Sequence, residues 1–160
     1  MKKRLSLIQM DVHVNNVEYN YSRVQELLAQ SLSESPDIIV LPETWNTGFY
    51  PSTELINIAD TNGDRTKALL SAFAKEHNVN IVGGSVAVAK DNLVFNTSYV
   101  YNRSGELVGE YSKMHGFSPA KEDKYFASGT HTTHFKLDGI PCSTVICYDI
   151  RFPELVRMAA

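Results

Sequence analysis

Cys147 lies in a stretch of the sequence that is suited to nucleophilic chemistry. The run 140–146 is rich in β-branched and apolar residues, which predicts a short strand. A helix is predicted to start directly after it, with Asp149 as a candidate N-cap and Pro153 in the first turn, where proline is tolerated. A thiol at the positive end of a helix has a lowered pKa, which makes thiolate available near neutral pH. The pattern therefore predicts that Cys147 is a nucleophile.

Two more reactive side chains follow predicted strands in the same way. Glu43 comes just after the wholly apolar run 38–41, and Lys113 follows a predicted strand over 107–112. In open α/β sheets, sites form outside the strand ends, so we expect these two side chains to share one pocket with Cys147.

A carboxylate, an ammonium group and a thiol in one pocket suit acyl transfer. Glu43 would accept the thiol proton and later return it to a leaving amine. Lys113, together with the backbone N–H of Tyr148, would stabilise the oxyanion of the tetrahedral intermediate. Cys147 would form an acyl thioester that water then cleaves.

Two helices are expected to position these strands. Asn15 or Asn16 can cap a helix that extends to about Leu32. Its apolar residues recur at helical spacing at Val17, Tyr21, Val24 and Leu28. A second helix is predicted over 63–78, with the apolar face Ala68, Leu69, Ala72 and Phe73.

Further strands are predicted at both ends of the chain and between the helices. They cover 4–11, 38–41, 81–88, 93–101 and 107–112, and a hairpin over 132–137 and 140–146. Irregular loops are expected over 44–62 and 114–129. The order of strands and helices predicts a single α/β domain over 1–160 with a mixed sheet.

The composition excludes several classes of protein. A hydrophobic content of 43% and a charged content of 21% are typical of a globular domain, and the net charge of −3 provides no basic surface for nucleic acid. No apolar run approaches the ~20 residues that cross a bilayer, and no signal-peptide core follows the basic start. The sequence therefore predicts a cytoplasmic protein without a membrane partner.

The cysteines and histidines indicate neither a disulfide nor a metal site. Cys142 and Cys147 lie five residues apart, so on one strand they would point to opposite faces. His115, His131 and His134 lack the spacing and the additional ligands of a metal centre. We expect no cofactor.

Three segments resemble the signature segments of the nitrilase superfamily of carbon–nitrogen hydrolases. They are Leu-Pro-Glu-Thr (41–44), Tyr-Ser-Lys-Met-His (111–115) and Cys-Tyr-Asp-Ile-Arg-Phe-Pro-Glu-Leu (147–155), the last being most similar to the Nit-type, ω-amidase-like branch. The resemblance implies that Glu43 is the general base, Lys113 the catalytic lysine and Cys147 the nucleophile. It also implies that Glu122 is a second glutamate that orients Lys113 or assists proton transfer.

The same resemblance implies an αββα sandwich, a homo-oligomer and a small amide substrate that releases ammonia. Family members are longer than this chain, which stops inside the helix after the nucleophile, so the domain is expected to be incomplete at its C-terminus. Gly116 stands where the family often has leucine, which makes the loop more mobile.

Several alternatives remain open at this point. The chain could be a catalytically inactive fragment or an interaction module, or a cysteine–histidine hydrolase with His115 as its base. Glu122 could belong to an ordinary charged loop, and Arg151 could bind a substrate carboxylate or pair with Glu154. Tyr148, Trp45 and Phe49 could line the pocket or belong to the core.

Overall fold

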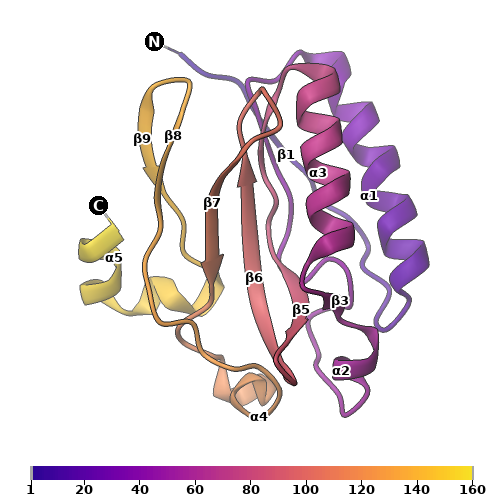
Figure 1. Cartoon of the computed structure of the whole chain (residues 1–160), viewed down its shortest axis with the longest axis vertical. Helices are drawn as coiled ribbons and strands as arrows, with labels where there is room; N and C mark the ends of the chain where they lie inside the picture. The colour runs from indigo at the N-terminus through magenta and orange to yellow at the C-terminus, as the bar shows by residue number, and fades with distance from the viewer. Residues whose placement is uncertain (1, 160) are drawn as a thin grey trace.

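The computed structural model describes residues 2–159 and shows an α/β fold (Figure 1). The strands are β1 (Leu5–Leu7), β2 (Ile38–Val40), β3 (Asp60–Thr61), β4 (Asn80–Val82), β5 (Val86–Lys90), β6 (Leu93–Tyr101), β7 (Leu107–Ser112), β8 (His134–Leu137) and β9 (Ile140–Ser143). The α-helices are α1 (Val17–Ser31), α2 (Leu55–Ile58), α3 (Asp64–His77), α4 (Glu122–Tyr125) and α5 (Pro153–Ala159). Three short 3-10 helices are η1 (Leu32–Glu34), η2 (Ser118–Ala120) and η3 (Cys147–Arg151).

Seven strands form one mixed sheet in the order β1-β2-β4-β6-β5-β3, and β7 pairs with β6. The strands β1, β2 and β4 are parallel and are joined through α1 and α3. The long strand β6 runs antiparallel to β4, β5 and β7. Parallel pairs need helical crossovers whereas antiparallel pairs can be joined by tight turns, so the sequence order accounts for this topology.

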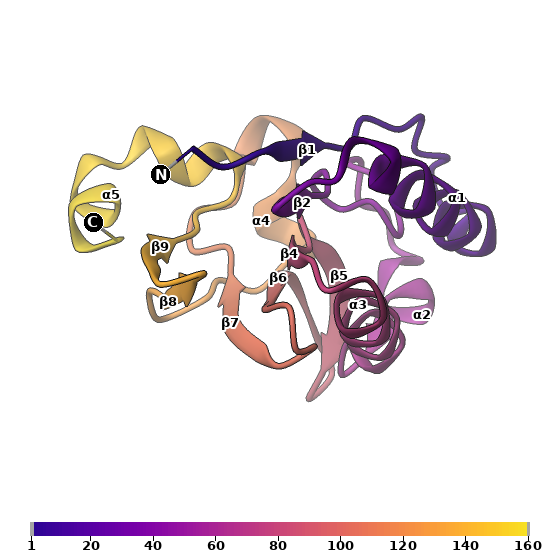
Figure 2. The same cartoon turned by 90° about the horizontal axis from the view of Figure 1, so that it is seen from above.

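Helices α1 and α3 cover one face of the sheet (Figures 1 and 2). Asn16 caps α1, because its side chain accepts a hydrogen bond of 3.3 Å from the backbone N–H of Tyr19. The predicted helical spacing holds, since Tyr21, Val24 and Leu28 are buried against the sheet. Each such side chain contributes about 1.5–3 kcal/mol through burial.

The hairpin of β8 and β9 covers part of the other face. Phe135 and Leu137 pack against Val100 of β6. Figure 2 shows this hairpin on the side away from α1 and α3, with α5 beyond it. The layers follow the order helix, sheet, sheet, helix, which confirms the predicted αββα class.

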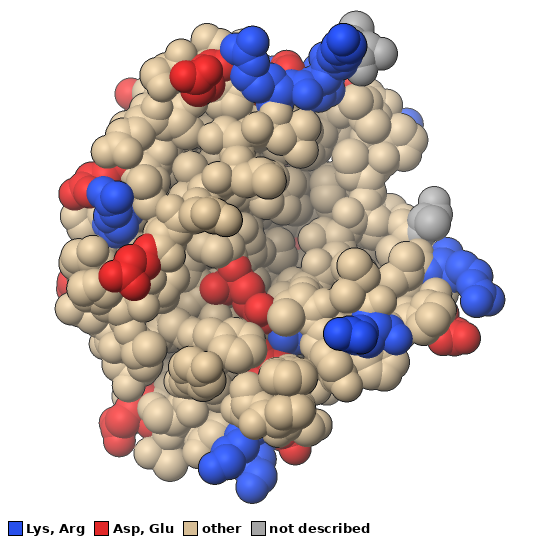
Figure 3. Space-filling view, turned by 180° about the vertical axis from the view of Figure 1, so that it is seen from behind, with Lys and Arg blue, Asp and Glu red and all other residues tan. Residues whose placement is uncertain are grey.

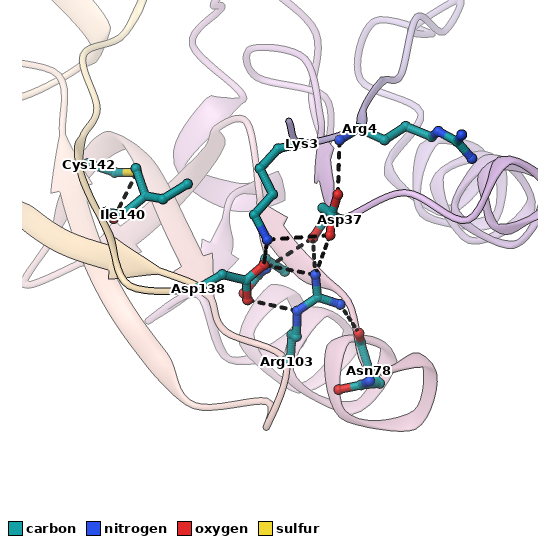
Figure 4. A network of polar contacts seen from close by, with 9 residues as sticks. Lys3, Arg4, Asp37, Asn78, Arg103, Asp138, Ile140 and Cys142 are labelled. Carbon is teal, nitrogen blue, oxygen red and sulfur yellow. Dashed lines mark hydrogen bonds and ion pairs between the residues drawn. The ribbon is translucent and has the colours of Figure 1, made fainter. Parts of the chain in front are cut away.

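A cluster of ion pairs ties the turn of this hairpin to the large sheet (Figure 4). Lys3 Nζ lies 2.7 Å from Asp138, and Arg103 donates to both Asp138 at 2.7 Å and Asp37 at 2.8 Å. The hydrogen bonds from Arg103 and Lys3 outweigh partial burial and hold the pKa of Asp138 well below its usual value. Because Asp37 directly precedes β2, the cluster holds the two sheets together at one end.

The prediction of which residues form the apolar face of α3 is partly wrong. Ala68 and Ala72 are exposed, whereas Thr66, Leu70 and Ala74 are buried. Alanine is a weak marker of a buried face because its small side chain is tolerated on either side of a helix.

Several boundaries also differ from the predictions. The strand predicted over 4–11 covers only Leu5–Leu7, and in the predicted hairpin only His134–Leu137 and Ile140–Ser143 pair, so β9 ends before Thr144 rather than at Cys147. The segment 81–88 forms two strands, β4 and β5, because Gly84 adopts a φ of +58° between them. The loop 44–62 contains α2 and β3, and the loop 114–129 contains η2 and α4. These elements are too short to show a clear period in the sequence.

Candidate active site

Carboxylates and an ammonium group from three segments meet at the strand ends. Lys113 Nζ lies 2.8 Å from Glu43 Oε1 and 2.8 Å from Glu122 Oε2. Glu43 follows β2, Lys113 directly follows β7, and Glu122 is the first residue of α4. In Figure 3, which shows the molecule from behind, acidic side chains lie in a hollow near the centre of the face, with a basic side chain beside them.

The turn that carries Glu43 is held by the short segment that joins β4 to β5. The backbone N–H of Thr44 donates to Ser85 Oγ at 3.0 Å, and Trp45 Nε1 donates to the carbonyl of Gly83 at 2.9 Å. A side chain at Gly84 would overlap the carbonyl oxygen of Pro42, so glycine is required for this close approach. Trp45 is fully buried in the core rather than lining a pocket.

Lys113 is almost completely buried and remains charged. Burial alone would lower its pKa, but hydrogen bonds and charges from Glu122 and Glu43 outweigh this and raise the pKa above its usual value. The side chain is therefore an ammonium group at neutral pH, which suits the stabilisation of negative charge.

Glu122 lies inside the site and is 1% exposed. Its Oε2 atom accepts hydrogen bonds from Lys113 Nζ at 2.8 Å and from the backbone N–H of Phe117 at 2.6 Å. An ordinary charged loop would leave this carboxylate in solvent, so the surface alternative for Glu122 does not hold. The burial and the pairing fix the position of the Lys113 ammonium group.

Cys147 is exposed and adopts an unusual backbone conformation. Its φ of +47° lies in the left-handed region, which costs a non-glycine residue about 1–3 kcal/mol. Cys147 opens η3, a five-residue 3-10 helix. The α-helix α5 starts only at Pro153, so the expectations that Asp149 caps an α-helix and that Cys147 meets its positive end are wrong.

The expected lowering of the Cys147 pKa is wrong as well. Desolvation of the thiol raises its pKa, and the charge and hydrogen bonding of Glu43 raise it further, while Lys113 opposes the shift. The thiol therefore keeps its proton near neutral pH, and a base has to remove that proton during attack. Glu43 is the candidate, since among the charged groups it has the largest effect on the pKa of the thiol.

The other predicted site residues differ in their surroundings. Tyr148 packs edge-on against Phe117 at 5.2 Å and against Phe152 at 5.6 Å. Arg151 is exposed and its side chain has no ion pair or hydrogen bond within residues 2–159, so the pairing with Glu154 is wrong. Phe49 stacks edge-on with Tyr50.

His115 does not occupy the place of a base for Cys147. Its Nδ1 atom lies 2.9 Å from Asp149 Oδ1, and its ring stacks on Phe152 at 3.6 Å. The charged groups that shift the pKa of Cys147 are Glu43, Lys113 and Glu122. This geometry argues against the cysteine–histidine alternative.

Asn96 is a residue of the site that the sequence analysis missed. It is 1% exposed, and its Nδ2 atom donates to Glu43 Oε1 at 3.0 Å. Its backbone carbonyl accepts a hydrogen bond from the N–H of Lys113 at 2.9 Å. The polar run Asn96-Thr97-Ser98 inside an otherwise apolar strand was the available signal, because buried polar groups need partners.

The described residues contain neither a metal centre nor a membrane-spanning helix. In residues 2–159, no group of three or more His, Cys, Asp and Glu side chains could hold a metal ion. None of the helices in that range is both long and apolar enough to cross a membrane.

The sequence matches the carbon-nitrogen hydrolase family over residues 4–160. It is 40% identical to 2-oxoglutaramate amidase from Bacillus subtilis over 157 residues, and 32% identical to a hydrolase in the agr operon of Staphylococcus aureus over 159 residues. Both alignments cover 98% of this chain and 60% of the relative. A CN-hydrolase superfamily protein from Xanthomonas campestris has a TM-score of 0.84 at 30% identity, over 95% of this chain and 56% of that chain.

The layer order and these similarities define the class, an αββα sandwich of the hydrolase type. The chain belongs to the carbon-nitrogen hydrolase family, the nitrilase superfamily, as predicted. Similarity to an omega-amidase from Arabidopsis thaliana, at 29% identity, agrees with the ω-amidase-like branch. The chain spans about 60% of the length of the curated relatives described above.

Proposed function

We propose that this protein is an amidase that hydrolyses a small linear amide to a carboxylic acid and ammonia through a thioester on Cys147. The observation that carries the proposal is the buried Lys113 ammonium group, held at 2.8 Å by both Glu43 and Glu122 beside the thiol. A fixed positive charge next to a nucleophile and a base suits the formation of an oxyanion.

In the first half of the reaction, Glu43 removes the proton of the Cys147 thiol as the sulfur attacks the amide carbon. The carbonyl oxygen becomes an oxyanion, which the Lys113 ammonium group and the backbone N–H of Tyr148 stabilise. The carbon–nitrogen bond then breaks, and protonated Glu43 returns its proton to the departing nitrogen. Ammonia leaves and the acyl group stays on the sulfur.

In the second half, a water molecule replaces ammonia. Glu43 takes one proton from the water as its oxygen attacks the thioester carbon, and Lys113 again stabilises the oxyanion. The carbon–sulfur bond breaks, the proton passes to Cys147, and the carboxylic acid is released. Glu122 holds Lys113 in place in both halves.

The proposed substrate class is the ω-amide of a short dicarboxylic acid. The Bacillus relative is a 2-oxoglutaramate amidase and the Arabidopsis relative an omega-amidase. Arg151 is exposed and can bind the far carboxylate of such a substrate. We propose that Tyr148, which follows Cys147 in the sequence, also contacts the substrate.

Other properties of the protein are also proposals. We propose that residues 1–160 belong to one carbon–nitrogen hydrolase domain and that the protein acts in the cytoplasm as a homo-oligomer. We propose that it needs no cofactor. The activity is proposed for the protein expressed from its complete gene.

The two cysteines provide a matched test of the proposal. Ammonia release from 2-oxoglutaramate is measured for Cys147→Ala and Cys142→Ala, where Cys142 lies on β9 and donates to the carbonyl of Ile140. We expect kcat to fall on the order of a thousandfold or more in Cys147→Ala and to stay near wild type in Cys142→Ala. Equal losses in both variants would contradict the assignment of the nucleophile.

A further inference from the structure

Asp149 is a fully buried carboxylate that the proposed chemical steps do not use. Its Oδ2 atom accepts hydrogen bonds from the hydroxyl of Tyr111 at 2.7 Å and from the backbone N–H of Ile146 at 3.1 Å. Its Oδ1 atom accepts a bond of 2.9 Å from the backbone N–H of His115 and lies 2.9 Å from His115 Nδ1. Both oxygens are thus fully engaged by the protein.

The residues that bond Asp149 are close in the sequence to Lys113 and Cys147. Tyr111 and His115 stand two residues before and two residues after Lys113, and Ile146 directly precedes Cys147. One carboxylate therefore joins both sides of the lysine segment to the turn that carries the nucleophile. These contacts link parts of the chain that are 34 and 38 residues apart.

The turn at Cys147 requires such support, because its φ of +47° is unfavourable for a residue with a side chain. The backbone N–H of Asp149 donates to the carbonyl of Ile146 at 3.1 Å, which closes the turn from the other side. The ring of His115 stacks on Phe152 at 3.6 Å, which holds the far end of η3 against the lysine segment. Without these contacts the turn can relax to an ordinary conformation.

We propose that Asp149 is a positioning residue that holds the Cys147 turn against the Lys113 segment, so that thiol, ammonium group and Glu43 keep the geometry of thioester formation. The inference rests on the proposed function. Asp149 is 0% exposed, so it acts through Cys147 and Lys113 rather than on a substrate.

Two buried tyrosines allow a matched test in the protein expressed from its complete gene. Tyr111→Phe removes the hydroxyl that donates to Asp149 and keeps the packing of the ring. Tyr21→Phe is the control, because the buried hydroxyl of this α1 residue also bonds a carboxylate, that of Asp60 on β3 at 3.0 Å. For each variant we would measure Tm, kcat, KM and the rate at which iodoacetamide alkylates Cys147.

We expect Tyr111→Phe to lower kcat on the order of tenfold with KM nearly unchanged, because a displaced nucleophile loses its alignment. The Cys147 alkylation rate should change with it. Tyr21→Phe should lower Tm without changing kcat or the rate of Cys147 alkylation. If Tyr111→Phe matches Tyr21→Phe in kcat and alkylation rate, the positioning role is refuted.

Asp149→Asn is the stronger variant, since the amide nitrogen would face a backbone N–H donor whichever way it turns, that of Ile146 or that of His115. We expect the pH midpoint for Cys147 alkylation to move from its raised value toward the ordinary thiol value of about 8.5. A folded Asp149→Asn protein with the wild-type midpoint would refute the proposal, and if this variant does not fold, Tyr111→Phe decides alone. Alkylation needs no amide turnover, so a failure of the proposed amidase activity would be seen separately.

Discussion

Replacing Lys113 with methionine removes a buried ammonium group that lies between two carboxylates. The side chain of Glu122 is 1% exposed and that of Glu43 is 20% exposed, and each lies 2.8 Å from Lys113 Nζ. Breaking a buried ion pair by removing one partner costs about 3–5 kcal/mol, because a buried charge stays behind. We therefore expect Lys113→Met to lower the free energy of unfolding by about that amount at pH 7, and Tm by about 6–20 °C.

The assay is urea denaturation of wild type, Lys113→Met, Glu122→Gln and the double variant. The double variant removes both charges, so it should be more stable than the single effects predict when added, with a coupling of about 0.5–3 kcal/mol. Lys3→Met is the matched control, since Lys3 also contacts two carboxylates, Asp138 and Asp37, but at the surface. Its loss of stability should be much smaller.

The pH dependence gives a second check on Lys113. Its pKa in the folded state is raised, so its contribution to stability is fully present below the unfolded value of about 10.4 and is lost as pH rises through the folded value. The difference in stability between wild type and Lys113→Met should therefore narrow above about pH 10.4. Two results would refute the assignment of a buried ion pair. One is that the stability effects add in the double variant, and the other is that Lys3→Met loses as much stability as Lys113→Met.

Four further variants test other parts of the site. Glu43→Gln should lower the pH midpoint for Cys147 alkylation, because the charge of Glu43 raises the pKa of the thiol; an unchanged or higher midpoint would count against that contact. Glu43→Ala should lower kcat for ammonia release far more than His115→Ala, and the reverse order would favour the cysteine–histidine alternative. Gly84→Ala should destabilise the protein by more than about 1 kcal/mol in urea denaturation and slow ammonia release, because its new methyl group would push Pro42 and the adjoining Glu43. Wild-type stability and a wild-type rate of ammonia release in this variant would contradict this expectation.

Much of the fold follows from local patterns in the sequence. The spacing of Tyr21, Val24 and Leu28 predicts α1, and Asn16 marks its start. The pairing of β6 with β7 follows from two apolar segments separated by a short turn. These features depend on neighbours within a few residues, so they are visible without the structure.

The meeting of Glu43 and Lys113 could be predicted because both side chains follow apolar strands. What the sequence did not reveal are contacts between distant parts of the chain. Asn96 and Glu43 are 53 residues apart, and Tyr111 and Asp149 are 38 residues apart. No local period reports such pairs.

The conformation of Cys147 was missed for a related reason. Its left-handed φ is held by bonds from Asp149 and its partners, whereas the local pattern favoured a helix start. The prediction about the thiol failed with it, since the raised pKa comes from partial desolvation of the thiol and from Glu43, a residue more than a hundred positions away.

The most direct test of the central claim is to trap the acyl-enzyme. The protein expressed from its complete gene is mixed with 2-oxoglutaramate, quenched in acid within the first turnovers, digested and mapped by mass spectrometry. We predict an acyl adduct on the peptide that contains Cys147, with Cys142 unmodified, and no adduct in Cys147→Ala. Ammonia release that persists in Cys147→Ala, or an adduct on another residue, would contradict the thioester mechanism.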